Sequence, residues 1–238
     1  MIKISYDFHI HSCLSPCGDN DMTPANIAGM AFVNGLDAIA LTDHNTVKNC
    51  LALKKAAESY GLVCLYGMEL TTLEEVHTVC LFADIDKANE WNDYVYSHLL
   101  KIKNNEDIFG SQLIMDSEDN IIGKEENLLI NATNISFDSV FSPVYELGGI
   151  AFPAHVDKDS YSLLSNLGFV PPEADFGVAE FKDLSKAESI ASLHPHFKNC
   201  TLLSNSDAHY LEQINTPVNF LQIEELSAHC IIDTLRKK

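Results

Sequence analysis

Seven short apolar runs, spread along the whole chain, constrain the fold more than any other feature. They are often rich in β-branched residues and predict strands at residues 3–8, 37–42, 62–68, 76–83, 149–154, 176–181 and 200–205. Helix-like segments separate many of them, at about residues 23–35, 46–60, 86–103, 135–147, 183–193 and 224–236. This alternation favours a mostly parallel sheet with helices outside it. Seven strands predict an α/β barrel short of the usual eight, in one domain of residues 1–238.

The segment 104–131 interrupts this alternation. Within it, the run QLIMDSEDNIIG predicts a β-hairpin whose turn is formed by the letters SEDN. We expect this hairpin to be an insertion into the barrel, lying over the face that carries the active site.

Histidine and carboxylate side chains gather at the ends of the predicted strands. The set comprises His9, His11, Asp43, His44, Glu69, His77, His155, Asp207 and His209. Side chains two positions apart on a strand share a face, so His9 and His11 can point the same way. Barrel enzymes place their sites at the carboxyl ends of the strands. Burying so many ionisable groups together is costly unless they coordinate cations, and the set therefore predicts a metal site.

His77 reaches the same end of the barrel by a different route. Only residues 70–76 separate it from Glu69. A parallel crossover needs about a dozen residues or more, so the strand that begins near His77 should run antiparallel to the one that ends near Glu69. The start of one strand then lies beside the end of the other.

Taken one at a time, these residues have ordinary explanations. Asp43 or Thr42 could cap a helix, and Glu69 could be a solvated residue at the start of a loop. Four further histidines lie outside the pattern, and structural or surface roles are expected for them: His98, His194, His196 and His229. The joint placement of the others at strand ends is what favours a metal site.

The order of these motifs resembles that of the PHP (polymerase and histidinol phosphatase) family. HIH at 9–11, TDH at 42–44, Glu69, His77, His155 and SDAH at 206–209 follow one another as its successive motifs do. The resemblance implies a distorted (β/α)7 TIM-like barrel. It also implies two or three divalent metal ions at the strand ends and hydrolysis of phosphoester bonds.

The resemblance further implies how the ligands divide. One metal is expected to be held by His9, His11, Glu69 and Asp207. Glu69 is expected to bridge it to a second metal, shared with His77 and His155. A third is expected to be held by His44 and His209.

The third site needs one more ligand from the segment after the first motif, and the chain offers two candidates there. Cys17 is a soft ligand that would favour zinc or iron, whereas Asp19 would favour a harder ion. Zinc, manganese and iron suit the histidines and carboxylates of the other sites equally well.

Neighbouring cations can lower the pKa of a bound water, and the resulting hydroxide would attack a phosphorus centre. Asp43 or His209 could pass a proton to the leaving group, and Lys158 could contact a phosphate. We therefore expect a metal-dependent hydrolase of a small phosphorylated substrate: a phosphomonoester, a nucleotide or a short oligonucleotide.

Two alternatives to this function stay open. One is a histidinol-phosphate phosphatase, although the single arginine, Arg236, leaves no obvious basic pocket for an imidazole phosphate. The other is a non-catalytic module, structural or regulatory, that metal ions merely stabilise. An open metal position would favour catalysis over the second alternative.

Charge and cysteine content narrow the partners. Lysine and arginine number 15 against 34 acidic residues, a net charge of −19 that opposes phosphate contacts, so no duplex nucleic acid partner is expected. The seven scattered cysteines suit a reducing compartment. The sequence also has neither a signal-peptide pattern nor a membrane-length apolar stretch. A cytoplasmic location without a membrane partner is expected, and the oligomeric state stays open.

Overall fold

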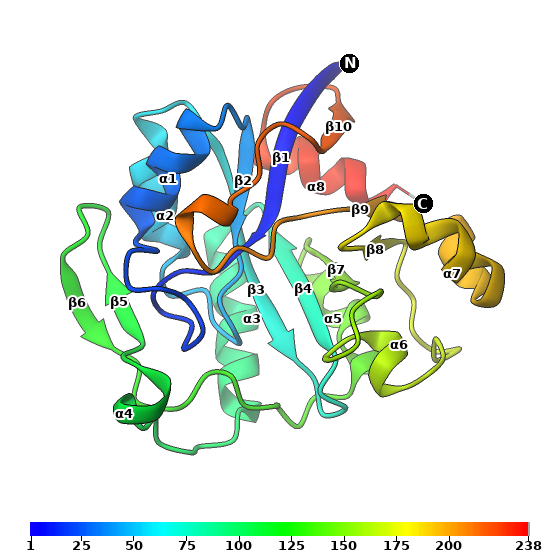
Figure 1. The fold of residues 1–238 in the computed structure, drawn as a ribbon, viewed down its shortest axis with the longest axis horizontal. Coiled ribbons are helices and arrows are strands. Elements are labelled where there is room, and N and C mark those ends of the chain that lie inside the picture. The colour runs from blue at the N-terminus through cyan, green and yellow to red at the C-terminus, as the bar shows by residue number, and fades with distance from the viewer. Residues whose placement is uncertain (238) are drawn as a thin grey trace.

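A curled six-stranded sheet runs through the protein, whose computed structural model describes residues 1–237 (Figure 1). The strand order is β10-β1-β2-β3-β4-β7. The strands are β1 (Ile2–Ile10), β2 (Ala38–Leu41), β3 (Val63–Thr71), β4 (His77–Phe82), β7 (Ile150–Pro153) and β10 (Phe220–Ile223). Two further strands, β8 (Val178–Glu180) and β9 (Thr201–Leu203), pair with each other in parallel.

The strand directions bring several strand termini to one edge of the sheet. β1, β2 and β3 run parallel, and β4 runs antiparallel to β3, with Thr71 opposite His77. The antiparallel turn expected from the short connection at residues 70–76 is therefore confirmed. β7 is antiparallel to β4 in turn, so the end of β7 lies at the same edge as the end of β3.

The seven strands expected from the sequence are all present, but they do not pair into one seven-stranded barrel. β8 and β9 have three residues each and form a sheet of their own, while the unexpected strand β10 pairs with the first half of β1. Other hydrogen bonds cross the gaps. The Phe8 amide donates to Asn205 Oδ1 at 2.8 Å, and the Val156 amide donates to the Glu180 carbonyl at 2.8 Å. The result is a mixed α/β fold with a curled half-barrel, because these two strands are too short to extend the ladder.

Helices α2 (Cys50–Glu58), α3 (Ile85–His98), α5 (Phe141–Glu146) and α8 (Ala228–Arg236) pack on the strands, and α1 (Pro24–Val33) packs on α2. The other helices are α7 (Ala187–Leu193) and the short α4 (Glu106–Phe109) and α6 (Leu163–Asn166). Thr23 caps α1 by accepting a hydrogen bond from the Asn26 amide at 3.4 Å. α2 begins four residues later than Thr46, the expected start, because Thr46 Oγ1 and the Val47 amide both donate to Asn92 Oδ1 of α3.

Two apolar clusters fill the space on either side of the sheet. One lies under the outer helices and includes Ile27 of α1, Leu53 of α2 and Trp91 of α3. The other joins strand residues to α8, with Ile231 and Leu235 among its members. In Figure 1, α8 lies near the end of the sheet where β1 begins, away from the edge where β3 ends.

A small antiparallel hairpin stands beside α1, formed by β5 (Leu113–Met115) and β6 (Ile121–Lys124) (Figure 1). The Leu113 amide donates to the Cys13 carbonyl at 3.1 Å, which joins the hairpin to the loop that follows β1. Within residues 1–237, no helix has the length and apolar character needed to cross a bilayer.

Candidate metal centre

Side chains able to bind a metal meet at the edge of the sheet where β1 and β3 end and β4 begins. They are His9 and His11 at the end of β1, His44 after β2, Glu69 of β3, His77 of β4, His155 after β7, and Asp207 and His209 after β9. All are buried except Asp207 and His209, which are partly exposed. Four other histidines belong to no such group within the described residues: His98, His194, His196 and His229.

Glu69 lies at the centre of the group and is 1% exposed. Its Oε1 lies 2.8 Å from His77 Nδ1, 3.2 Å from His155 Nε2 and 3.3 Å from His9 Nε2. Its Oε2 lies 3.3 Å from His11 Nε2 and 3.2 Å from His44 Nδ1. A carboxylate that presents one oxygen to each of two sets of imidazoles has the position of a ligand that bridges two cations.

Asp207 closes the group on the side of β9. Its Oδ1 lies 3.5 Å from His9 Nε2 and 3.4 Å from His11 Nε2, and its Oδ2 pairs with Lys158 Nζ at 3.0 Å. Two groups of residues each bring their ligand atoms within 4.8 Å of one another. The first group is His9, His11, Glu69 and Asp207, and the second is His44, Glu69 and His77. In the second set, His44 stands where the family resemblance implied His155.

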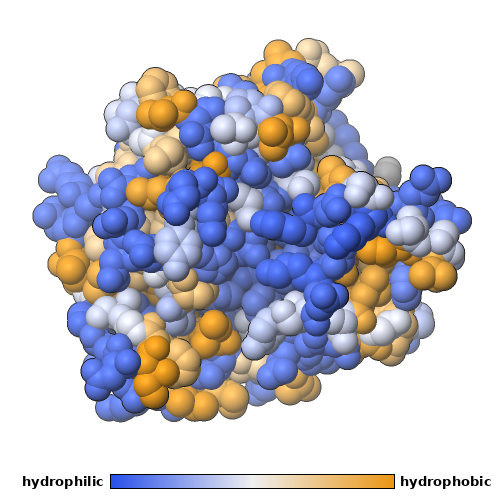
Figure 2. All heavy atoms as spheres, viewed as in Figure 1, coloured by the Kyte–Doolittle hydropathy of each residue, from blue (hydrophilic) through white to orange (hydrophobic). Residues whose placement is uncertain are grey.

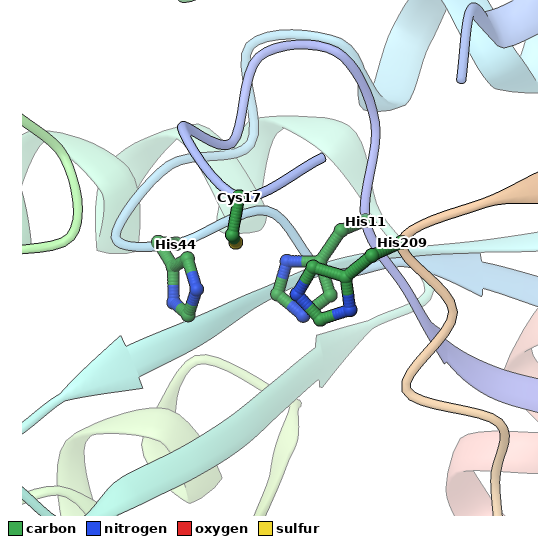
Figure 3. A group of neighbouring side chains, drawn as sticks. All are labelled: His11, Cys17, His44 and His209. Atoms are coloured by element: carbon green, nitrogen blue, oxygen red, sulfur yellow. The ribbon is translucent and has the colours of Figure 1, made fainter. Parts of the chain in front are cut away.

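A third set of side chains surrounds Cys17. Ligand atoms of His11, Cys17, His44 and His209 lie within 4.8 Å of one another. Figure 3 shows Cys17 between His44 on one side and His11 and His209 on the other. Asp19, the alternative, does not join this set, because its Oδ1 accepts a hydrogen bond from the Asp21 amide at 2.8 Å within its own loop. Of the two candidates, only Cys17 is brought to the histidines.

The backbone is strained at two of these residues. His155 has a φ of 29° and Asp207 a φ of 54°, a region that costs about 1–3 kcal/mol for a residue with a side chain. Hydrogen bonds hold both turns: the His155 amide donates to Glu180 Oε1 at 3.1 Å, and the Asp207 amide donates to the His9 carbonyl at 2.9 Å. Such strain at the ends of two different strands is typical of functional sites.

Glu180, which the sequence analysis missed, supports His9 from behind. Its carboxylate lies 3.0 Å from His9 Nδ1 and accepts a hydrogen bond from the Asn205 side chain at 2.7 Å. A carboxylate on the outer nitrogen of a metal-binding histidine fixes the orientation and tautomer of the ring. A signal for it was present in the sequence, because Glu180 closes the predicted strand 176–181 much as Glu69 follows the predicted strand 62–68.

Asp43 has a comparable place behind His11. Its carboxylate accepts hydrogen bonds from the Ser12 amide at 2.7 Å and from Ser15 Oγ at 2.7 Å, and Ser15 Oγ lies 3.0 Å from His11 Nδ1. The expected proton shuttle at Asp43 is not supported by this geometry, because the carboxylate is held by the loop after β1 and is 1% exposed. Its position is that of a residue that orients His11 through Ser15.

The charges in the cluster depend strongly on one another. Burial opposes charge on Glu69, yet His77 and His9 hold its pKa well below the usual range. Burial also opposes charge on His11, but Asp207 and Glu69 raise its pKa to about 9. Burial, together with His11, lowers the pKa of His209 to about 4. Binding of cations here would have to release the protons of histidines such as His11, because a metal requires the neutral imidazole.

The residues present fit a group of bound cations. His44 Nδ1 is buried, lies 3.2 Å from Glu69 Oε2 and, among residues 1–237, has no hydrogen-bond partner. Imidazole nitrogens, carboxylates and one thiol are the donors that transition metals prefer. A cluster of this composition satisfies its buried polar atoms best when cations lie among them.

A groove of about 730 Å³ leads from this centre to the surface. Its lining includes Cys17, Asp207 and His209 on the inside and the two lysines Lys158 and Lys182. Lys182 Nζ donates to the Ser206 carbonyl, so it is held next to the Asp207 turn. Figure 2 shows hydrophilic residues gathered across the middle of this face of the molecule. The candidate metal centre therefore borders a groove that is open to solvent and carries two lysines beside Asp207.

Sequence comparison identifies a family and two relatives that match part of the chain. The family model for the PHP domain matches residues 7–158, more than half of the chain. An uncharacterized protein of Methanocaldococcus jannaschii is 33% identical over 91 residues, 34% of this chain and 53% of that protein. A 5'-3' exoribonuclease of Haemophilus influenzae is 32% identical over 82 residues, 33% of this chain and 29% of that protein.

Structural comparison extends the likeness to the whole fold. Endonuclease Q of Pyrococcus furiosus superposes with a TM-score of 0.71 at 18% identity, covering 99% of this chain and 56% of that one. An endonuclease Q structure in complex with a 27-mer duplex, with an abasic lesion at the active site, gives a TM-score of 0.70 at 18% identity, over 99% of this chain and 57% of that one. The chain thus spans little more than half the length of these relatives, and less than a third of the exoribonuclease.

The duplex complex overturns one expectation from the sequence. We expected no duplex nucleic acid partner, and a small substrate only, on the ground of the net charge of −19. The same fold in endonuclease Q is seen with duplex DNA at its active site. The exclusion was wrong because total charge does not report the local charge at a groove, and here Lys158 and Lys182 line it.

Proposed function

The chain belongs to the PHP domain family, and from that premise we propose that it is a metal-dependent phosphoesterase whose hydrolytic centre is the cluster around Glu69. The observation that carries the proposal is the position of this carboxylate, whose oxygens lie within 3.3 Å of nitrogens from five histidines. A site that only stabilised the fold would close its coordination shell with protein ligands. This one lies beside an open groove.

We propose that the centre binds two or three divalent cations, drawn from zinc, manganese and iron. The first would be held by His9, His11, Glu69 and Asp207, the second by Glu69, His77 and His155, and the third by Cys17, His44 and His209. When bound, such cations supply a water of lowered pKa and offset the charge on the phosphoryl oxygens.

His209 fits the role of a ligand better than that of a proton shuttle. Its Nδ1 lies 2.8 Å from the Asp207 carbonyl, which can only accept, so Nδ1 carries the proton of the neutral ring. The Nε2 lone pair is then left to face the other ligands. Lys158, paired with Asp207 at the groove, is placed to contact a phosphate oxygen of the substrate.

We infer that the substrate is a phosphodiester of a nucleic acid. The two lysines lie along one groove and are placed to contact successive phosphates, which a chain of nucleotides provides. Two of the similar proteins, the Haemophilus influenzae exoribonuclease and endonuclease Q, are nucleases by name. The groove favours neither single strands nor duplexes, so both belong in the assay.

The experiment is an assay of protein loaded with each candidate metal. The substrates are a 5'-phosphorylated single-stranded oligonucleotide, the same sequence as a duplex with and without an abasic site, and a simple phosphomonoester. We expect hydrolysis of at least one oligonucleotide, lost in Glu69→Gln and kept in Glu188→Gln, an exposed position on α7. A loaded protein that cleaves no phosphoester would overturn the proposal.

A further inference from the structure

Tyr161 lies beside the candidate metal centre, in the loop that follows β7 and also carries Lys158. Its ring stacks on the ring of His77, with centroids 4.8 Å apart and planes 20° apart. The residue is 49% exposed, so its ring is only partly covered by His77 and the loop. An exposed aromatic ring packed against a candidate metal ligand is therefore available to a substrate.

The backbone of Tyr161 has an unfavourable conformation that the loop stabilises by hydrogen bonds. Its φ of 53° lies in the left-handed region, which is unfavourable for a residue with a side chain. The His77 amide donates to the Tyr161 carbonyl at 2.9 Å, and the next residue, Ser162, caps α6 by accepting from the Ser165 amide at 3.1 Å. Ser162 Oγ also donates to the Lys158 carbonyl at 2.7 Å, which closes the loop on itself. The hydrogen bonds of the loop fix the Tyr161 ring in place despite the backbone strain, so the ring is suited to stack on a planar group of a substrate.

The same loop places a charged side chain and an aromatic side chain beside the candidate metal centre. Lys158 pairs with Asp207 at the groove, whereas Tyr161, three residues later, stacks on His77. A phosphate between the two would have a cation on one side and an aromatic ring on the other. Alternating charged and flat contacts are what a nucleotide chain offers, since phosphates and bases alternate along it.

We propose that Tyr161 is a specificity residue that stacks on the base next to the cleaved phosphate, while the rest of the strand follows the groove past Lys158 and Lys182. This inference rests on the proposed function and narrows it to substrates with a base at that position. Stacking on an aromatic side chain is largely independent of the base sequence. Tyr161 would therefore favour a substrate with any base at this position over a substrate that lacks a base there. If the Tyr161 ring only supported His77, the protein would not distinguish these two substrates.

A fluorescence experiment tests the stacking directly in the metal-loaded protein. The probe is a short single-stranded oligonucleotide with phosphorothioate linkages, which slow hydrolysis, carrying 2-aminopurine at one position at a time. Stacking quenches this base, so we expect quenching at one position with the native protein and with Tyr161→Phe. In Tyr161→Ala the quenching should vanish and the dissociation constant should rise roughly tenfold or more. Tyr60→Ala is the matched control, because Tyr60 is 41% exposed and stacks on Phe32 far from the site.

A kinetic experiment separates stacking from support of His77. Two substrates are compared, one with a base beside the cleaved phosphate and one with a tetrahydrofuran residue there. We expect Tyr161→Ala to lower kcat/KM roughly tenfold on the first and to leave the second unchanged. Equal losses on both, or unaltered quenching in Tyr161→Ala, would overturn the inference. If the native protein cleaves neither, the proposed function fails, and the quenching still decides whether Tyr161 stacks on a base.

Discussion

Glu69 is the residue on which the geometry of the site depends. It has imidazoles on both of its oxygens, and it is the single residue shared by the two ligand sets at the centre of the cluster. Its burial is tolerable only because positive groups surround it, whether imidazolium ions or metal ions. A change at this position therefore disturbs both ligand sets at once.

Glu69→Gln should lose at least one bound metal ion and reduce activity by roughly a hundredfold or more, because an amide is a weak ligand and carries no charge. Elemental analysis of the purified variant and kcat/KM on the preferred oligonucleotide measure both effects. The variant should remain folded by circular dichroism. A Glu69→Gln protein with full metal content and native kcat/KM would contradict the role given to this carboxylate.

Glu180→Gln should weaken metal binding by about 10- to 100-fold, because His9 loses the carboxylate that orients its ring. Competition with a chelating dye measures the affinity. Activity at saturating metal should recover most of its native value, which distinguishes an orienting residue from a ligand. Glu188→Gln, on the surface of α7, serves as the control and should bind metal like the native protein. An unchanged affinity in Glu180→Gln would show that Asn205 and the backbone suffice to hold the site.

Among the elements, the hairpin of β5 and β6 is tied to the start of α1 by one residue of its turn. Asp119, with a φ of 62°, accepts hydrogen bonds from Thr23 Oγ1 at 2.5 Å and from the Ala25 amide at 2.9 Å. The first amides of a helix lack partners in the helix and attract negative charge. The hairpin thus caps α1 and also holds the loop that carries Cys17, through the bond from Leu113 to Cys13.

Asp119→Asn should lower the free energy of unfolding by about 0.5–1 kcal/mol, because the charge at the helix terminus is lost while an oxygen acceptor stays. Asp119→Ala should cost about 1–2 kcal/mol, since the cap is lost and alanine is less tolerant of the left-handed backbone. Urea unfolding midpoints measure both, with Glu118→Gln in the same turn as the control. If Asp119→Ala unfolds at the native midpoint, the hairpin does not stabilise α1.

At the scale of the whole molecule, metal binding and stability should be linked. The buried cluster holds several histidines and carboxylates whose charges satisfy one another only in part. Cations that bind the folded chain and not the unfolded one stabilise it by mass action. The strands β1, β3, β4 and β7 contribute or adjoin ligands, so this stabilisation acts on the sheet as a whole.

A chelator-treated protein should therefore gain about 2.7 kcal/mol when a metal is added at a hundred times its dissociation constant. For a chain of this size the gain corresponds to a rise in Tm of roughly 5–10 °C. Differential scanning calorimetry with and without manganese or zinc measures it, and Glu69→Gln should show a much smaller rise. A native Tm that is the same in metal and in chelator would exclude this linkage.

The sequence alone determined the family, the strands and the residues that gather at their ends. Apolar runs placed all seven expected strands, because short β-branched segments are a local property. The antiparallel turn before His77 was also predictable, since its seven-residue connection is too short for a crossover. Two features were missed. β10 is an edge strand of only four residues, too short to stand out in the sequence. Glu180 closes a strand but has no neighbouring histidine in the sequence.

Only the tertiary structure decided how these parts meet. It placed Cys17 rather than Asp19 beside His44 and His209, and it turned Asp43 away from the ligands toward Ser12 and Ser15. It also split the expected barrel, with β8 and β9 apart from the six-stranded sheet. The physical reason is the same in each case. Residue type and spacing define which groups can bind a cation, whereas hydrogen bonds between distant segments, such as the one between Asp7 and Ser206, 199 residues apart, define which of them face it.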